Sequence, residues 1–136
     1  GPRQNWKGPL AGVIPHNVQR LLAGGRPVIH GTGLQRRDFI FVMDTVDAVI
    51  KLYDRLESGE SVNVCTDGQM TIQEVIEGIC TCMGKAPGTE FKEGRQSDLE
   101  SHRGSPLKLL GLIDHQKTAF EDGLQITVEW YVDRIK

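Results

Sequence analysis

The stretch GTGLQRRDFIFVMD, residues 31–44, combines a glycine turn, an arginine pair, an apolar run and two aspartates. Its apolar part, DFIFV at 38–42, is rich in aromatic and β-branched residues and has the length of a β-strand. In an alternating strand, Arg37 points to the same face as Phe39 and Phe41. An arginine at the mouth of a core-facing row is costly without an anionic partner. The stretch therefore predicts a strand that begins beside either an anion site or a solvated edge.

Strands and helices alternate on both sides of this stretch. Runs of β-branched and aromatic residues predict further strands at 27–31, 61–65 and 89–94. Apolar residues at helical spacing predict helices at 13–22, 44–56, 71–83, 105–110 and from 118 to the end. Short strands interleaved with about five helices predict a small mixed α/β domain, formed by residues 1–136 as one unit.

Side chains near the predicted helix ends support these boundaries. The segments 71–74 and 118–121 have the spacing of capping boxes, and Asp44 is the expected N-cap of the second helix. The inward face of that second helix is expected to carry Val46, Val49, Ile50, Tyr53 and Leu56. The apolar stripe of the last helix is expected to carry Phe120, Leu124, Val128, Tyr131 and Ile135. The polar segment 92–106 predicts a long surface loop, a kind of segment that often carries function.

The composition is that of an ordinary globular protein. A chain of 136 residues can form one substantial core, and its net charge of −2 argues against a general attraction to nucleic acid or membranes. No apolar run approaches a membrane span and the first residues lack the layout of a signal peptide, so the cytoplasm is the expected compartment. The cysteines Cys65, Cys80 and Cys82 are expected to be reduced structural thiols. The four histidines are scattered without metal-ligand spacing, so we expect no metal site.

Motifs for catalysis are absent from the sequence. It contains no nucleophile elbow, no Walker loop and no zinc-protease motif. The turn at 31–33 lacks the third glycine of a dinucleotide-binding loop, and a predicted strand follows it in place of a helix. What remains is anion binding, because guanidinium groups grip phosphates through paired planar donors. The candidates are Arg36, Arg37, Arg95, Arg103 and Lys92, and each of them could instead be a solvated surface charge.

Several blocks of the chain resemble the carboxyl-terminal half of NAD-dependent nucleotide-sugar epimerases and dehydratases, which are extended short-chain dehydrogenases/reductases. The most specific blocks are G-x-G-x-Q-x-R-D-F at 31–39, V-x-D at 42–44 and S-x-x-x-x-L-G at 105–111. The resemblance covers essentially the whole chain, and the order and spacing of the blocks carry it. It implies the fold of that family's carboxyl-terminal lobe without the family's Rossmann domain.

The resemblance also implies how a diphosphate would be held. By this resemblance, Arg37 would contact the diphosphate of a nucleotide sugar. Arg95 and Asp98 match an R-x-x-D pair that reaches phosphate and ribose in the family. Between them, residues 96–97 are Gln-Ser where the family commonly has Pro-Gly.

The nucleoside end of the site follows from the same resemblance. Val13 and Ile14 lie in the segment that lines the nucleotide pocket. His30 stands where the family often places an aromatic residue against the nucleobase. The implied ligand is a UDP-, dTDP- or GDP-linked sugar.

The catalytic parts of that family belong to its other half, which holds the glycine-rich NAD loop and a Y-x-x-x-K pair. In this chain Tyr53 and Tyr131 are followed four residues later by Glu57 and Ile135, not by lysine. We therefore expect no catalytic residue and no cofactor in this chain, and a substrate-binding domain that is inactive alone. The alternative is a stand-alone, non-enzymatic protein that self-associates through the surface that faces the Rossmann domain in the family.

Overall fold

The computed structural model describes residues 1–8, 11–86, 88–94 and 99–135. The elements, in chain order, are α1 (Val13–Leu22), β1 (Val28–His30), β2 (Arg36–Arg37), α2 (Val42–Leu52), β3 (Met70–Thr71), α3 (Ile72–Cys82), β4 (Glu90–Lys92), β5 (Ser101–His102), α4 (Leu107–Leu112) and α5 (Phe120–Ile135). The described residues thus form five helices and short strands, which confirms the predicted mixed α/β architecture.

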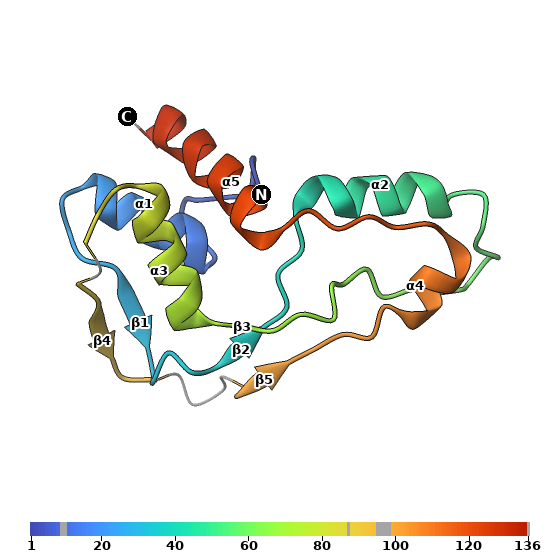
Figure 1. Cartoon of the computed structure of the whole chain (residues 1–136), viewed down its shortest axis with the longest axis horizontal. Helices are drawn as coiled ribbons and strands as arrows, with labels where there is room; N and C mark the ends of the chain where they lie inside the picture. Colours follow the sequence, from blue (N-terminus) through green and yellow to red (C-terminus); the bar gives the residue numbers. More distant parts are fainter. Residues whose placement is uncertain (9–10, 87, 95–98, 136) are drawn as a thin grey trace.

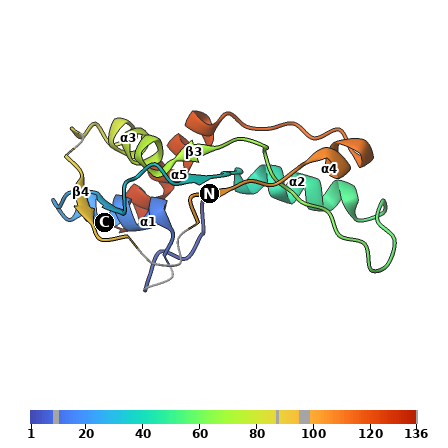
Figure 2. The ribbon, with the colours of Figure 1, turned by 90° about the horizontal axis from the view of Figure 1, so that it is seen from below.

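The molecule has a thick end and a thin end (Figures 1 and 2). At the thick end, α1, α3 and α5 pack together beside β1 and β4. At the thin end, α2 and α4 lie apart from the other helices, and extended segments connect them to the rest. The strands β2, β3 and β5 lie between the two ends.

The strands form two small sheets. In the first, β1 and β4 run parallel, with His30 opposite Lys92. In the second, β2 is the middle strand, antiparallel to β3 and parallel to β5. This register sets Arg37 between Met70 and His102, so these three residues share one face of the sheet.

Each end of the molecule has its own apolar core. The larger core joins α1, α3, α5 and β1; its fully buried members include Val18, Ile29, Ile76, Val128 and Tyr131. The smaller core is at the thin end and contains Ala48, Leu52, Leu109 and Ile113. Because only the larger core joins several long helices, it is the rigid base against which a ligand cavity can be built.

One predicted cap and one predicted helix face agree with the structure. The capping box before α3 is confirmed: the amide of Glu74 donates to Thr71 Oγ1 at 3.1 Å, and the amide of Thr71 donates to Glu74 Oε2 at 2.7 Å. The predicted stripe of α5 is also confirmed, since Leu124, Val128 and Tyr131 are buried in the larger core. A second predicted box, at 118–121, is wrong, because α5 begins two residues later than its first member.

The prediction of a strand at 38–42 is wrong. Pairing in β2 stops at Arg37, because the aromatic side chains that follow pack on α5 and draw the chain away from the sheet. Phe39 meets Phe120 edge to face with 5.7 Å between ring centroids. Phe41 lies so close to α5 that a methyl group at Gly123 would come within 3.1 Å of its ring.

Asp44 is not the N-cap that the sequence predicts. The N-cap of α2 is Phe41, and Asp44 lies in the first turn of the helix with 9% of its surface exposed. Its carboxylate accepts hydrogen bonds from the Thr118 amide at 2.8 Å and the Thr118 hydroxyl at 2.7 Å. This pair of bonds ties the start of α2 to the segment that leads into α5, and it explains why Thr118 does not cap α5.

The predicted inward face of α2 is also wrong. Most of its residues are exposed, from 42% for Val46 to 84% for Tyr53, and Met43 beside them is 58% exposed. The buried residues of α2 are Asp44, Ala48 and Leu52, which lie on another side of the helix. Amphipathic spacing identifies an apolar face, but it does not say whether the partner of that face belongs to the same chain.

Two further predictions about strands differ from the structure. Residues 61–65 form no strand, because no described segment pairs with them, although Val62 and Val64 do pack on the smaller core. Conversely, β5 lies inside the segment that was expected to be a surface loop throughout. A strand of two residues carries too little pattern to be recognised in a polar sequence.

Candidate functional site

A cavity of about 540 Å³ opens between α1, β1 and the residues around β2. Its lining includes Val13, Asn17, Val28, His30, Arg37 and Phe39. We call it the Arg37 cavity. Three of the residues that the family resemblance singles out, Val13, His30 and Arg37, thus line one cavity although they come from three different elements.

The glycine turn after β1 forms one edge of the Arg37 cavity. Gly31 and Gly33 have φ values of +82° and +81°, a conformation that glycine adopts without strain. The turn brings Gln35 back to β1, where its Nε2 donates to the carbonyl of His30 at 2.7 Å. The motif G-x-G-x-Q therefore turns the chain from β1 into β2. As a result, His30 and Arg37 line the same cavity.

Arg37 is anchored from two sides. Its Nη1 donates to the carbonyls of Arg36 and Leu99, each at 2.8 Å. Leu99 lies just before β5, so the short pairing between β2 and β5 also fixes the arginine. A guanidinium has five N–H donors in a planar fork, and a fork held in this way is suited to phosphate or carboxylate oxygens.

The walls of the Arg37 cavity that are formed by the start of α1 and by His30 are less polar than the wall formed by Arg37. Val13 begins α1, whose N-cap Gly12 offers no side-chain hydrogen bond to the first turn. His30 ends β1, and its Nδ1 lies 3.4 Å from the carbonyl of Glu93. An aliphatic helix start, an imidazole and an anchored guanidinium can together surround a ligand with an apolar ring at one end and an anion at the other.

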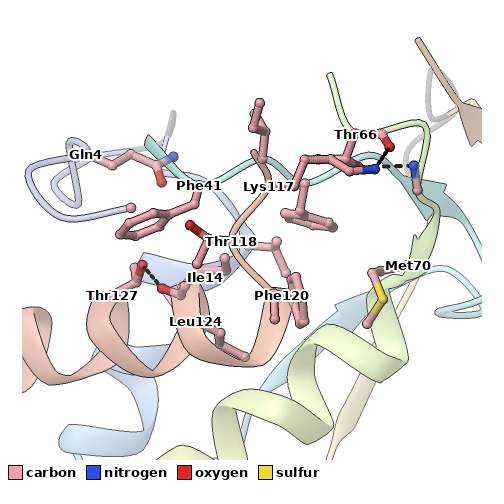
Figure 3. A pocket seen from close by; sticks show the side chains of 18 of the residues that line it. Gln4, Ile14, Phe41, Thr66, Met70, Lys117, Thr118, Phe120, Leu124 and Thr127 are labelled. Atoms are coloured by element: carbon pink, nitrogen blue, oxygen red, sulfur yellow. Dashed lines mark hydrogen bonds between the residues drawn. The ribbon is translucent and has the colours of Figure 1, made fainter. Parts of the chain in front are cut away.

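A second cavity, also of about 540 Å³, adjoins the first and shares Gly12, Val13 and Phe39 with it. Figure 3 shows this second cavity from close by. Its apolar lining includes Ile14, Phe41, Met70, Phe120 and Leu124. Two of the polar groups on its wall are engaged within the chain: Lys117 Nζ donates to the carbonyl of Thr66 at 2.9 Å, and Thr127 Oγ1 donates to that of Gly123 at 2.6 Å. Ile14 lines this second cavity and not the Arg37 cavity, whereas Val13 lines both.

The remaining predicted residues have different outcomes. Arg95 and Asp98 lie outside the described residues. Arg103 does not line either cavity, since its Nε pairs with Asp67 Oδ1 at 2.7 Å. Sequence reasoning did not single out Asn17 or Gln35, which both line the Arg37 cavity. The signal for Asn17 is a polar residue among the apolar positions of α1, and the signal for Gln35 is its fixed place in the G-x-G-x-Q block.

Other chemistry finds little support among the described residues. Burial raises the pKa of the thiols of Cys65, Cys80 and Cys82 above the ordinary cysteine value, which disfavours the reactive thiolate. Within the described ranges, no group of three His, Cys, Asp or Glu side chains is placed to hold a metal ion. Among the same residues, no helix is both long and apolar enough to cross a membrane.

Comparison with known proteins gives the same family from sequence and from structure. Residues 1–65 match the NAD dependent epimerase/dehydratase family. A UDP-glucose 4-epimerase of Mycolicibacterium smegmatis is 32% identical over 96% of this chain, and a UDP-N-acetyl-alpha-D-glucosaminuronate decarboxylase of Bacillus cytotoxicus is 29% identical over 96%. The crystal structure of UDP-glucose 4-epimerase from Thermotoga maritima with UDP-glucose matches all of this chain at a TM-score of 0.89 and 27% identity.

These relatives are much longer than this chain. It spans 42% and 43% of the two curated relatives and 44% of the Thermotoga maritima structure. The matched part nevertheless includes both sheets, the glycine turn and the Arg37 cavity, because it covers nearly the whole chain. The chain belongs to the NAD-dependent epimerase/dehydratase family.

Proposed function

We propose that this chain is the nucleotide-sugar-binding part of an NAD-dependent epimerase or dehydratase, and that it performs no hydride transfer by itself. One observation carries the proposal: Val13, His30 and Arg37 line one cavity although 24 residues separate the first from the last. In the proposed pose the diphosphate lies against Arg37, and the base lies between the start of α1 and the ring of His30. Relatives of this chain are named for UDP-, dTDP- and GDP-linked sugars, and UDP-glucose serves as the probe because it is bound in the Thermotoga maritima structure.

The chain's own residues would bind and orient the substrate rather than transform it. Arg37 supplies positive charge and paired donors to the diphosphate, and the anchoring carbonyls of Arg36 and Leu99 keep the guanidinium in place. The imidazole of His30 offers a flat surface for a base to stack on. NAD would supply the hydride chemistry in the family. The glycine turn of this chain, with Gly31 and Gly33, leads into β2 and not into a helix, so this turn differs from a dinucleotide-binding loop.

Nuclear magnetic resonance tests this proposal directly. We expect UDP-glucose, added to the ¹⁵N-labelled chain, to shift the amide signals of Val13, Val28 and His30 in one saturable process. Signals from α4, at the thin end of the molecule, serve as the internal control and should stay in place. Unchanged spectra at millimolar UDP-glucose and low salt would contradict the proposal, as would shifts confined to the thin end.

A second proposal concerns the partner of the thin end. We propose that the exposed face of α2, formed by Met43, Val46, Val49, Ile50 and Tyr53, packs against the NAD-binding half that the family resemblance implies. Two observations favour this: the face is apolar along the helix, and the nearby segment 61–65 has strand-like composition without a pairing strand among the described residues. A strand of the partner can pair with residues 61–65, and another apolar element of the same partner can cover the exposed face of α2.

The same surface can be covered by a second copy of the chain, which is the alternative partner. Light scattering at increasing concentration distinguishes these cases. We expect self-association of the isolated chain that Ile50→Lys abolishes. Asp47→Asn on the same helix is the control, because it makes the net charge more positive by the same single unit without placing a charge on the apolar face. A strict monomer at the highest concentration would overturn self-association. An unchanged oligomer in the Ile50→Lys variant would show that another surface is responsible.

A further inference from the structure

A buried amide joins two walls of the Arg37 cavity. Asn17 lies on α1 and only 1% of its surface is exposed. Its Nδ2 donates to the carbonyl of Val13 at 2.9 Å, and its Oδ1 accepts from the amide of Val28 at 2.7 Å. Because Val13 and Val28 both line the cavity, the two hydrogen bonds of one side chain connect the start of α1 to β1.

The bond to Val28 has a specific geometric reason. In the ladder between β1 and β4, the Glu90 amide donates to the carbonyl of Pro27 at 2.8 Å, and the Gly31 amide donates to the carbonyl of Lys92 at 2.9 Å. Since alternate residues of a strand direct their backbone groups to opposite edges, Val28 directs its N–H away from β4. That N–H points to the α1 side, where Asn17 is its acceptor.

An apolar residue at position 17 would leave this N–H without its acceptor. A buried donor without a partner is costly, and the cost falls if water enters between α1 and β1. Water there would let the two walls move apart on the side where the base is proposed to lie. A ligand would then have to expel the water and close the gap before it could make its contacts.

We infer that Asn17 is a positioning residue that holds α1 and β1 at the spacing required by the nucleoside part of the ligand. This inference rests on the proposed function of the Arg37 cavity. Asn17 bonds to Val13 and Val28, whereas the Nη1 of Arg37 bonds to the carbonyls of Arg36 and Leu99. The inference therefore treats two parts of one ligand separately: binding of the nucleoside depends on Asn17, and binding of the diphosphate does not.

The test compares UDP with inorganic pyrophosphate, which lacks the nucleoside. Calorimetric titrations are made on the parent chain, on Asn17→Leu, and on Thr127→Val as the matched control. Thr127 is a buried polar residue whose hydroxyl bond lies within α5, and it lines only the second cavity. For Asn17→Leu we expect UDP affinity to fall about tenfold while pyrophosphate affinity is unchanged; Thr127→Val should change neither.

The outcomes separate this inference from the proposed function. Equal UDP affinity of Asn17→Leu and the parent overturns the inference, as does an equal loss of both ligands, which is the signature of a general folding defect. A parent chain that binds pyrophosphate but not UDP overturns the inference and leaves the anion role of Arg37. A parent chain that binds neither ligand overturns the proposed function itself, and the inference with it.

A second measurement does not depend on the variant folding. In the ligand-free parent, the amide of Val28 should exchange slowly with deuterium because Asn17 already holds it. The exposed Leu34, whose amide donates to the Thr32 hydroxyl at 3.2 Å, is the reference for a solvent-accessible bond in the same turn region. Exchange at Val28 as fast as at Leu34 would overturn the inference.

Discussion

Removal of the Asp44 carboxylate should break the link between α2 and the segment that leads into α5, and it should thereby lower the free energy of unfolding. Asp44 is nearly buried and accepts two hydrogen bonds from Thr118, at 2.8 and 2.7 Å. Hydrogen bonds to a charged group contribute about 1.5–3 kcal/mol each and are not fully additive when they share one partner. Because Asp44→Ala also leaves the Thr118 amide without its acceptor, we expect a loss of about 3 kcal/mol in the free energy of unfolding.

Urea unfolding followed by circular dichroism measures this loss. Asp44→Asn keeps the shape and one acceptor oxygen, so its loss should be about half as large, roughly 1.5 kcal/mol. Asp47→Ala is the control in the same helix: its carboxylate pairs with Lys51 at 2.7 Å on the surface, and its removal should cost less than about 1 kcal/mol. An Asp44→Ala variant as stable as Asp47→Ala would refute the account of how α2 is tied to α5.

Two further predictions concern a cap and a turn. Hydrogen bonds from Thr71 hold the pKa of Glu74 below its usual range, so Glu74 stabilises the fold above pH ~4.3 and loses that contribution as the pH falls further. The melting temperatures of the parent and Glu74→Gln should therefore differ at pH 7 and approach each other as the pH falls below ~4.3, and a constant difference would contradict this. Gly33→Ala should cost about 2 kcal/mol in chemical unfolding, since Gly33 has φ +81° and the new methyl would lie 3.0 Å from Ile29 Cδ1. Gly59→Ala, with φ +87° and nothing within 4 Å, isolates the conformational part at about 1 kcal/mol, so equal losses would rule out the contact with Ile29.

The elements that could be predicted from sequence are those whose determinants are local. The helix α3 follows from Thr71 and Glu74, two residues three positions apart that satisfy each other's backbone. The burial of Leu124 and Val128 follows from helical spacing in a segment that packs within the same chain. In both cases the information needed lies within a few residues.

The predictions that failed depend on distant contacts. The run at 38–42 has strand composition, but Phe39 packs on Phe120, which lies far along the sequence. The strand β2 therefore stops at Arg37, before this run. The face of α2 has core composition, but no described residue covers Ile50 or Tyr53. Local pattern identifies a surface that needs a partner, and only the tertiary structure shows whether this chain provides it.

The candidate site could be predicted from local pattern only in part. Alternation along the sequence placed Arg37 and Phe39 on one face, and both do line the same cavity although the strand itself is too short. The joining of this face to Val13 and His30 came from the family resemblance and not from any local pattern. Asn17 was missed because it is one of several polar residues of α1, and the sequence does not show that its side chain is buried and bonded to β1.

The affinity of two neighbouring arginine variants for UDP-glucose tests the central claim most directly. Arg37 lines the cavity, whereas Arg36 shares the opposite face of β2 with Thr71 and Ser101 and lines neither cavity. A charged pair of hydrogen bonds to phosphate is worth about 1.5–3 kcal/mol, so calorimetry should find Arg37→Ala roughly 10- to 100-fold weaker than the parent. Arg36→Ala should bind within about twofold of the parent at moderate salt, where screening removes most of the effect of a remote charge. Equal affinities for the two variants would contradict the claim that Arg37 holds the diphosphate.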